Sequence, residues 1–204
     1  MLAKQKKSSI AHRFRGLLPI VVDVETSGLT PETDALLEIA AVPITMNAEG
    51  KMVRMETTAY HIEPFLGANI DPEALAVTGI DPDYPLRYAI PEKQALLRLF
   101  ARVSELLLIT RCKRAVLVGH NAWFDLSFMQ HAAKRSQIMQ DNPFHSFTTF
   151  DTATLAGVAM GETVLAKAVR AAHIDFDVHA AHSAIYDAEK TADLFCYIVN
   201  QVSS

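Results

Sequence analysis

The sequence predicts an α/β fold in which helices flank a mixed central sheet. Short apolar runs rich in β-branched residues indicate buried strands, and longer segments carry apolar side chains at helical spacing. The order of these segments, three strands followed by helices alternating with strands, is typical of an α/β protein. The chain has 204 residues, half of them apolar, so we expect one domain over residues 1–204, in which residues 1–12 are a flexible basic N-terminus.

Three strands are predicted in the first third of the chain. Residues 17–25 contain four β-branched side chains in an apolar run, and residues 36–45 form a second such run. Turn residues at 47–50 then lead into residues 52–62, so the second and third strands should form a hairpin. Asp71 stands before a proline and is a suitable N-cap for the first helix.

The rest of the chain alternates between helices and strands. Residues 91–109 place their apolar side chains on one side of a helix. The other predicted elements are a strand at 115–119, a helix at 121–135 with Asn121 as its cap, a short strand at 147–150, and helices at 152–160, 163–173 and 183–200, the last with Ser183 as its N-cap.

The composition excludes several classes of protein. Two distant cysteines, Cys112 and Cys196, form neither a disulfide framework nor a zinc-ligand pattern, and we expect both to be reduced and buried. No apolar run approaches the roughly 20 residues that span a bilayer. Residues 1–15 have no apolar signal-peptide core, so we expect a cytoplasmic protein without a membrane partner.

The net charge of −4 is unusual for a protein that binds phosphates, which as a rule presents a basic surface. The basic residues are nevertheless clustered. The clusters are Lys4, Lys6, Lys7, Arg13 and Arg15 near the start, then Arg111, Lys113 and Arg114, then Lys134 and Arg135. Each cluster is as compatible with an ordinary solvated surface as with a phosphate-binding patch.

Four carboxylates stand next to predicted element ends. Asp23 and Glu25 point the same way from the first strand, and the apolar residues around them disfavour a simple solvent-facing strand end. Asp125 lies in the first turns of a helix that follows a strand, where ligands bind in open α/β sheets, although the helix dipole alone would also stabilise it there. Asp187 lies in the first turns of the last helix, and His182 lies on the loop before it.

These residues are more informative together than singly. All-oxygen carboxylate ligation suits Mg²⁺ or Mn²⁺ rather than zinc. Two such ions about 3.5–4 Å apart can hold both the attacking and the leaving oxygen of a phosphodiester. His182, taken alone, is more simply explained as a surface residue, but beside such a centre a histidine can accept the proton of an attacking water. The set predicts a phosphodiester hydrolase.

The motifs are Asp-x-Glu at 23–25, Asn-Ala-x-Phe-Asp at 121–125 and His-x-Ala-x-x-Asp at 182–187. In this order they resemble the DEDD exonuclease superfamily, in its His-containing branch, from residue 13 to residue 200. Within the branch the chain is most similar to the ribonuclease T family. The stretches that carry this closer similarity are 34–41, 63–69, 72–76 and 150–153.

The resemblance implies a ribonuclease H-like exonuclease fold and 3′→5′ hydrolysis. It implies that Asp23, Glu25, Asp125 and Asp187 hold two Mg²⁺ ions, with Mn²⁺ as a possible substitute, and that His182 is the general base. The expected substrates are the 3′ ends of stable RNAs, including tRNA and ribosomal RNA, and single-stranded DNA. A homodimer is also implied, in which a basic patch on one subunit feeds the active site of the other. Arg13, Arg15 and Arg114 match that patch, and Lys113, Lys134 or Arg135 could extend it.

The resemblance also implies contacts to the terminal bases. Glu73, Phe124 and Phe147 match positions that hold bases in the family, and core packing is the less favoured alternative for both phenylalanines. Leu29 and Val77 stand where ribonuclease T carries phenylalanines, which puts the base preference in doubt but not the catalysis.

Two other functions compete with RNA trimming. One is a proofreading or general DNA exonuclease, because residues 77–80 are closer to the generic pattern of the branch. The other is a nucleic-acid binding module without catalysis. The complete set of carboxylates argues against the binding module, because clustered charges with no cation would destabilise the fold.

Overall fold

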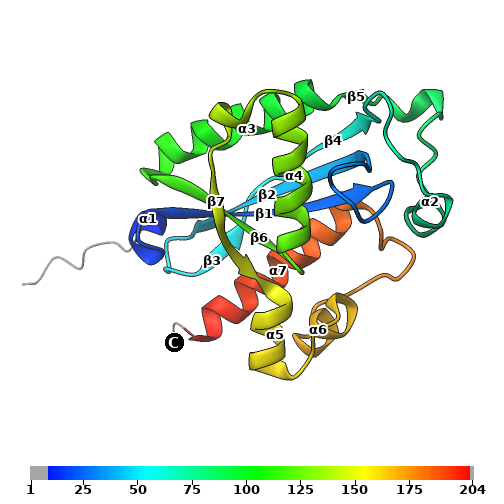
Figure 1. Ribbon diagram of the computed structural model, residues 1–204. Coiled ribbons are helices and arrows are strands. Elements are labelled where there is room, and N and C mark those ends of the chain that lie inside the picture. The colour runs from blue at the N-terminus through cyan, green and yellow to red at the C-terminus, as the bar shows by residue number, and fades with distance from the viewer. Residues whose placement is uncertain (1–8, 203–204) are drawn as a thin grey trace, which may run out of the picture.

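The computed structural model describes residues 9–202 (Figure 1). The strands are β1 (Leu17–Thr26), β2 (Leu36–Met46), β3 (Met52–Arg54), β4 (Thr58–Glu63), β5 (Ile90–Pro91), β6 (Arg114–Gly119) and β7 (Phe144–Asp151). The helices are α1 (Ile10–Arg13), α2 (Pro72–Thr78), α3 (Glu92–Thr110), α4 (Trp123–Arg135), α5 (Thr152–Met160), α6 (Leu165–Ala171) and α7 (Ala184–Val202), with short 3-10 turns η1 (Pro85–Arg87) and η2 (Met139–Asp141).

The strands form one mixed sheet, which confirms the predicted fold class. Their order is β5-β4-β2-β1-β6-β7, and β3 pairs with the far end of β2. The β1–β2 and β2–β4 pairs are antiparallel, whereas β6 runs parallel to both β1 and β7. Strand β1 is therefore the point at which an antiparallel half of the sheet meets a parallel half.

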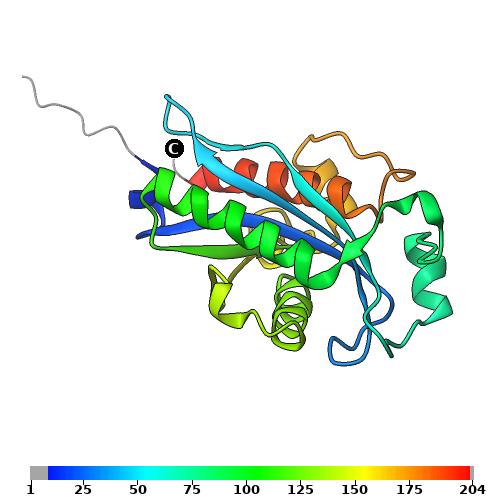
Figure 2. The same cartoon turned by 90° about the horizontal axis from the view of Figure 1, so that it is seen from above.

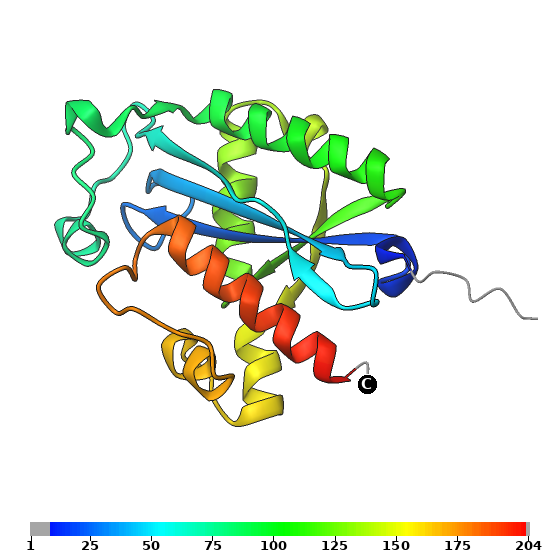
Figure 3. The same cartoon turned by 180° about the vertical axis from the view of Figure 1, so that it is seen from behind.

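The sheet lies between two layers of helices. Helices α3 and α4 pack on each other and on one face, whereas α7 packs on β1, β2 and β3 from the other face, with α5 and α6 beside it. Figure 2 shows the sheet edge-on between α4 and α7, and Figure 3 shows α7 lying across the strands from behind. Buried apolar side chains from both layers and the sheet form the main core, and a smaller cluster joins α5, α6 and α7.

The predicted third strand, 52–62, is two strands. Residues Ile44–Met46 of β2 pair with β3, and residues Glu38–Ala41 pair with β4. Between them lies Pro43, which has no N–H to donate to a neighbouring strand, so the segment between β3 and β4 leaves the sheet there. The predicted hairpin is otherwise confirmed.

Other predicted boundaries also shift. Residues 10–12 of the expected flexible N-terminus belong to the fold, because α1 begins at Ile10 and this side chain is buried in the core; residues 1–8 lie outside the described part of the chain. The strand predicted at 147–150 extends over residues 144–151, and the helix predicted at 163–173 covers residues 165–171. The Asp71 cap is confirmed, because its carboxylate accepts the Glu73 N–H at 2.9 Å.

Arg135 is not available for a basic patch. Its guanidinium makes a two-pronged ion pair with the buried Glu92, at 2.6–3.0 Å, and donates to the Pro31 carbonyl at 3.0 Å. The same group stacks over the Phe65 ring, 4.3 Å from its centroid. These contacts join α4 to α3 and to the loop after β1, so we correct its suggested role to a structural one.

Among the described residues, no helix is long and apolar enough to cross a membrane.

Candidate metal centre and nucleotide pocket

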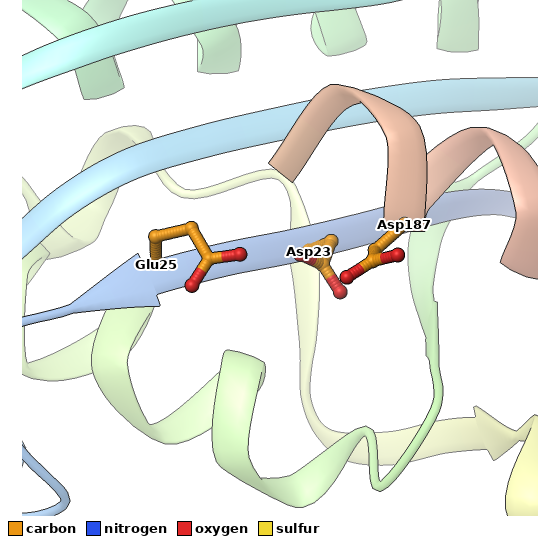
Figure 4. Close-up of side chains that lie close together, drawn as sticks. All are labelled: Asp23, Glu25 and Asp187. Atoms are coloured by element: carbon orange, nitrogen blue, oxygen red, sulfur yellow. The ribbon is translucent and has the colours of Figure 1, made fainter. Parts of the chain in front are cut away.

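Three of the predicted ligands meet at the middle of the sheet. Asp23 and Glu25 alternate along β1 and so project from the same face, and Asp187 reaches them from the first turn of α7. One carboxylate oxygen from each lies within 4.8 Å of the others. Figure 4 shows the three carboxylates pointing toward one another between the strand and the helix. The spacing along β1 therefore predicted this geometry correctly for the first two residues.

These carboxylates lack hydrogen-bond donors. Within residues 9–202, no donor bonds the side chain of Asp23 or of the buried Glu25. Asp187 accepts the His182 N–H on Oδ2 at 3.0 Å, but its Oδ1 is buried without a partner. A buried anion that is neither paired nor hydrogen-bonded is costly, so this arrangement needs a cation or a proton.

The pKa values of these carboxyl groups show the same cost of burying unpaired charges. Burial, followed by the charges of Asp187 and Glu38, raises the pKa of Glu25 to about 8. Burial also raises the pKa of Asp23 well above its usual range, and the charges of Asp125 and Glu25 add to the effect. Burial raises the pKa of Asp187 as well, although the His182 N–H opposes it. A divalent cation would replace the protons, and the all-oxygen donor set fits one.

Asp125, the fourth predicted ligand, lies next to this cluster but outside the group of three. The pairing of β1 with β6 ends at Val21, so the Val24 N–H is left over on that edge and donates to Asp125 Oδ1 at 3.1 Å. Gly119, at the end of β6, permits this approach, because a Cβ there would lie 2.9 Å from Asp125 Oδ2. The buried Asp125 also has a pKa raised well above its usual range, chiefly by burial.

The turn before α4 is held by a residue that the sequence analysis missed. Asn121 does not cap the helix; it adopts a left-handed conformation, φ 68°, and Ala122 occupies the cap position without a side-chain bond. Instead, Asp151 Oδ1 accepts the N–H groups of Asn121 and Ala122 at 2.8 and 3.2 Å. Asp151 Oδ2 caps α5 through the Thr154 N–H, and an Asp before a helical segment was the available signal.

His182 lies on the loop before α7, as predicted. Its φ of 65° turns the backbone so that the N–H reaches Asp187, while the side chain is exposed. Ser183 directly precedes the helix, and its carbonyl accepts the Asp187 N–H at 3.0 Å. The loop histidine and the helix aspartate therefore converge, whereas a fully helical segment would have set them roughly 140° apart.

A pocket of about 350 Å³ opens beside Glu25. It lies between the end of β1, helix α2 and the start of α4, and Glu73 and Phe124 both line it. Leu29 and Val77, which are 81% and 61% exposed, complete its apolar wall. The structure thus brings together two predicted base-contacting residues and both positions where an aromatic ring was expected.

Phe147 is not part of this pocket. It lies in the irregular part of β7, is 79% exposed, and makes an edge contact with the His145 ring at 4.7 Å. Core packing, the alternative considered for both phenylalanines, does not apply to Phe147. Phe124 is half-buried and packs against Phe128 in the core while it also faces the pocket.

The predicted arginine patch lies at the other end of the sheet. Arg15 lies two residues before the start of β1 and Arg114 begins β6, whereas the carboxylates lie toward the carboxyl end of β1. Figure 1 shows α1 and α2 at opposite ends of the molecule, and residues of α2 line the pocket. At about 3.3 Å per residue, β1 separates the patch from Glu25 by roughly 25 Å. Arg13 stacks over Phe14, and Arg114 Nε donates to the Phe144 carbonyl at 3.2 Å.

Comparison with known proteins identifies relatives of this chain. A family model described as exonuclease, of the ribonuclease T type, matches residues 20–195. Ribonuclease T of Shewanella denitrificans is 54% identical over 95% of this chain and 85% of its own length. Ribonuclease T of Marinobacter nauticus is 57% identical over 94% of this chain and 86% of its own length.

Solved structures show the same fold. E. coli exonuclease I in complex with a dT13 oligonucleotide superposes with a TM-score of 0.66 at 20% identity, over 92% of this chain and 42% of that chain. A 3′-exonuclease that recognises the 3′ end of a histone mRNA stem-loop superposes with a TM-score of 0.71 at 16% identity, over 90% and 64%. This chain spans less than half of exonuclease I. The predicted ribonuclease H-like exonuclease fold is confirmed.

The raised pKa values predict how stability depends on pH in the absence of metal. The folded pKa of Glu25, about 8, lies above its ordinary value of 4.5, so the folded chain keeps a proton that the unfolded chain releases. The free energy of unfolding in EDTA should therefore fall as the pH rises from about 4.5 to about 8, by on the order of 1 kcal/mol per pH unit for each proton kept. Urea denaturation across this range measures the slope.

Glu25→Gln should make this slope shallower, because it removes one of the groups that keep a proton. Glu49→Gln, at an exposed turn position, is the matched control and should retain the wild-type slope. A wild-type stability that rises with pH in EDTA would contradict the assignment.

Proposed function

The chain belongs to the ribonuclease T family of exonucleases, and from this premise we propose that it removes nucleotides from the 3′ ends of stable RNAs as a single exonuclease domain. Its substrates would be tRNA ends and the 3′ extensions of ribosomal and small RNAs, with single-stranded DNA also accepted. The observation that carries this proposal is the group of three donor-poor carboxylates that opens directly onto a pocket of nucleotide size.

The carboxylates would hold two divalent cations, Mg²⁺ by preference. Asp23, Glu25 and Asp187 would hold one, and Asp125 would share the second with Asp23, whose pKa its charge already raises. Bound cations would neutralise the scissile phosphate and lower the energy of the charge that develops on it during hydrolysis. The chain's own part is to fix these oxygens: β1 and α7 hold the group of three, and the Val24 N–H holds Asp125.

His182 would act as the general base. Its exposed side chain lies on a loop, so it can reach a water beside the phosphate, and its backbone N–H is tied to Asp187. It would take the proton from the attacking water and release it to solvent.

The pocket would receive the terminal base. Phe124 offers an aromatic face, Glu73 offers a carboxylate acceptor, and the aliphatic Leu29 and Val77 replace two rings that would stack on the base. Since stacking is worth about 1–3 kcal/mol per base, the aliphatic wall should hold a base less tightly than an aromatic wall would. This pocket is therefore suited to exonucleolytic release with weaker base selection.

We further propose a homodimer that completes the substrate path. Arg15 and Arg114 lie too far from Glu25 along β1 to bind the nucleotides next to the cleaved bond in the same chain. A second copy could set its patch beside this pocket, which would supply positive charge to a chain whose net charge is −4.

A DNA exonuclease is the second candidate. It is favoured by the fold shared with exonuclease I, whose structure holds a dT13 oligonucleotide, and by the absence of aromatic rings at positions 29 and 77. Relative turnover on single-stranded RNA and DNA ends of the same sequence distinguishes the two candidates.

The central test uses a single-stranded RNA labelled at its 5′ end and followed on a gel. With Mg²⁺ we expect a ladder that shortens one nucleotide at a time, and no shortening in EDTA or with Asp23→Asn. His182→Ala should slow the reaction by about 10²–10⁴-fold, because it removes the base but not the cations. His179→Ala changes another exposed histidine of the same loop and should keep wild-type activity.

Full activity in EDTA would refute the metal mechanism. Binding of RNA and DNA without cleavage of either would support the silent binding module instead.

Leu29→Phe tests the base pocket. A ring at this position can stack on the terminal base, so KM for short RNA should fall by about tenfold with little change in kcat. Leu108→Phe, at an exposed position near the end of α3, is the control and should leave KM unchanged. Steady-state kinetics with matched RNAs measure both values, and an unchanged KM for Leu29→Phe would show that the base does not enter this pocket.

Mixing two inactive variants tests the dimer. Asp23→Asn lacks a metal centre but keeps its patch, whereas Arg15→Ala/Arg114→Ala keeps its centre but lacks the patch. Random exchange gives half mixed dimers with one complete site each, so about a quarter of wild-type activity should return. If mixing restores nothing although light scattering shows a dimer, then the patch does not serve the partner's site.

A further inference from the structure

A fifth carboxylate stands beside the metal centre. Glu38, on β2, is paired directly with Glu25 of β1, and His61, on β4, is paired directly with Glu38. Directly paired residues of antiparallel strands project from the same face, with Cβ atoms about 4.5–5.5 Å apart. Glu25, Glu38 and His61 therefore form a row across three strands, on the face that α7 covers.

The two glutamates of this row differ in their surroundings. Glu38 has a partner, because its Oε1 lies 2.8 Å from His61 Nδ1, whereas no described donor reaches the buried Glu25. The Glu38 side chain is only 15% exposed although that of its partner is 48% exposed. Residues Ala184 and Ile185 at the start of α7 line a small cavity together with Glu38 and His61.

The backbone fixes this row in place. The register between β1 and β2 shifts directly after Glu25, where Thr26 pairs with Leu36 and Leu37 is passed over. The Leu37 carbonyl accepts a hydrogen bond from the Arg87 guanidinium, which also donates to the Ile62 carbonyl at 3.2 Å. The ladder from Ile20–Pro43 to Glu25–Glu38 is regular and sets Glu38 opposite Glu25, and the bulge interrupts the pairing only beyond this pair.

Like charges directly opposite each other destabilise a sheet, and the charge of Glu38 acts on both Glu25 and Asp23. The charge of Glu38 also favours the charged form of the half-buried Arg87, whereas the pairing with His61 could be made by a neutral side chain. Within the row, a cation bound at Glu25 would be attracted by the charge of Glu38, which otherwise repels its carboxylate neighbours.

We propose that Glu38, oriented by His61, is a positioning residue of the metal centre that strengthens cation binding at Glu25 without contacting the cation. This inference rests on the proposed metal centre and extends it by one strand. Substitution of a residue that supports a metal ligand without binding the metal commonly changes the metal affinity by about 10–100-fold. Glu38 lies next to the proposed ligand Glu25 in this way.

The test is Mn²⁺ binding to the whole protein without RNA, followed by electron paramagnetic resonance of the unbound ion. Glu38→Gln keeps the acceptor for His61 but removes the charge, and it should weaken Mn²⁺ binding by about tenfold or more. Glu38→Asp keeps the charge and should bind Mn²⁺ nearly as well as the wild type. Glu32→Gln is the matched control, because Glu32 also pairs with a histidine, His131, at 3.2 Å, away from the centre.

Thermal denaturation in EDTA supplies a second readout. Above about pH 8, where Glu25 becomes ionised without metal, removing a like charge from the row should raise the melting temperature of Glu38→Gln above that of the wild type, whereas loss of a merely structural group would lower it.

The outcomes are distinguishable. Weaker Mn²⁺ binding together with a higher melting temperature supports the proposal. Wild-type Mn²⁺ affinity in Glu38→Gln would overturn it while leaving the metal centre intact. A wild-type protein that binds no Mn²⁺ would overturn both the centre and this inference.

Discussion

Carboxylates crowd the middle of the sheet and repel one another in a region where few donors reach them. Asp23, Glu25 and Asp187 share a space of a few ångströms, and Asp125 and Glu38 add negative charge from either side. A protein without a use for a cation gains nothing from this arrangement, because burial and repulsion both oppose ionisation. Much of the rest of the molecule serves to hold these side chains together against that cost.

Backbone interactions are the main features that hold these carboxylates in place. The mixed topology makes β1 the strand between the antiparallel and the parallel half, so one of its edges is open beyond Val21 and receives Asp125. Asp151 fixes the turn before α4 through two N–H groups, and Gly119 leaves room for the carboxylate. On the opposite edge, the regular register between β1 and β2 sets Glu38 opposite Glu25. The centre is therefore rigid before any cation binds, which favours binding because little order has to be gained.

The sequence was sufficient for the parts of the fold that depend on local pattern. Period-two alternation placed Asp23 and Glu25 on one face, and the cap at Asp71 predicted the start of α2. Prediction from the sequence failed where a residue far away along the chain determines the local structure. Asn121 has the chemistry of a cap, but it adopts a left-handed conformation, and Asp151, thirty residues further on, accepts the N–H groups of Asn121 and Ala122. Arg135 was grouped with surface charges because its partner Glu92 is distant in sequence. Glu38 was hidden in an apolar run, since only the register between strands sets it opposite Glu25.

The distance between the basic patch and the pocket follows from the same topology. Parallel strands β1 and β6 begin at one end of the sheet, where Arg15 and Arg114 lie, and their carboxyl ends point toward the centre. The carboxylates that would hold the cations are then at one end of a subunit. The arginines, which would hold the nucleic-acid strand further from the cleaved bond, are at the other end. Separating them avoids ion pairs between the arginines and the carboxylates, which would leave neither group for phosphate or metal. In the proposed homodimer, the patch of a second subunit would lie beside the pocket of the first.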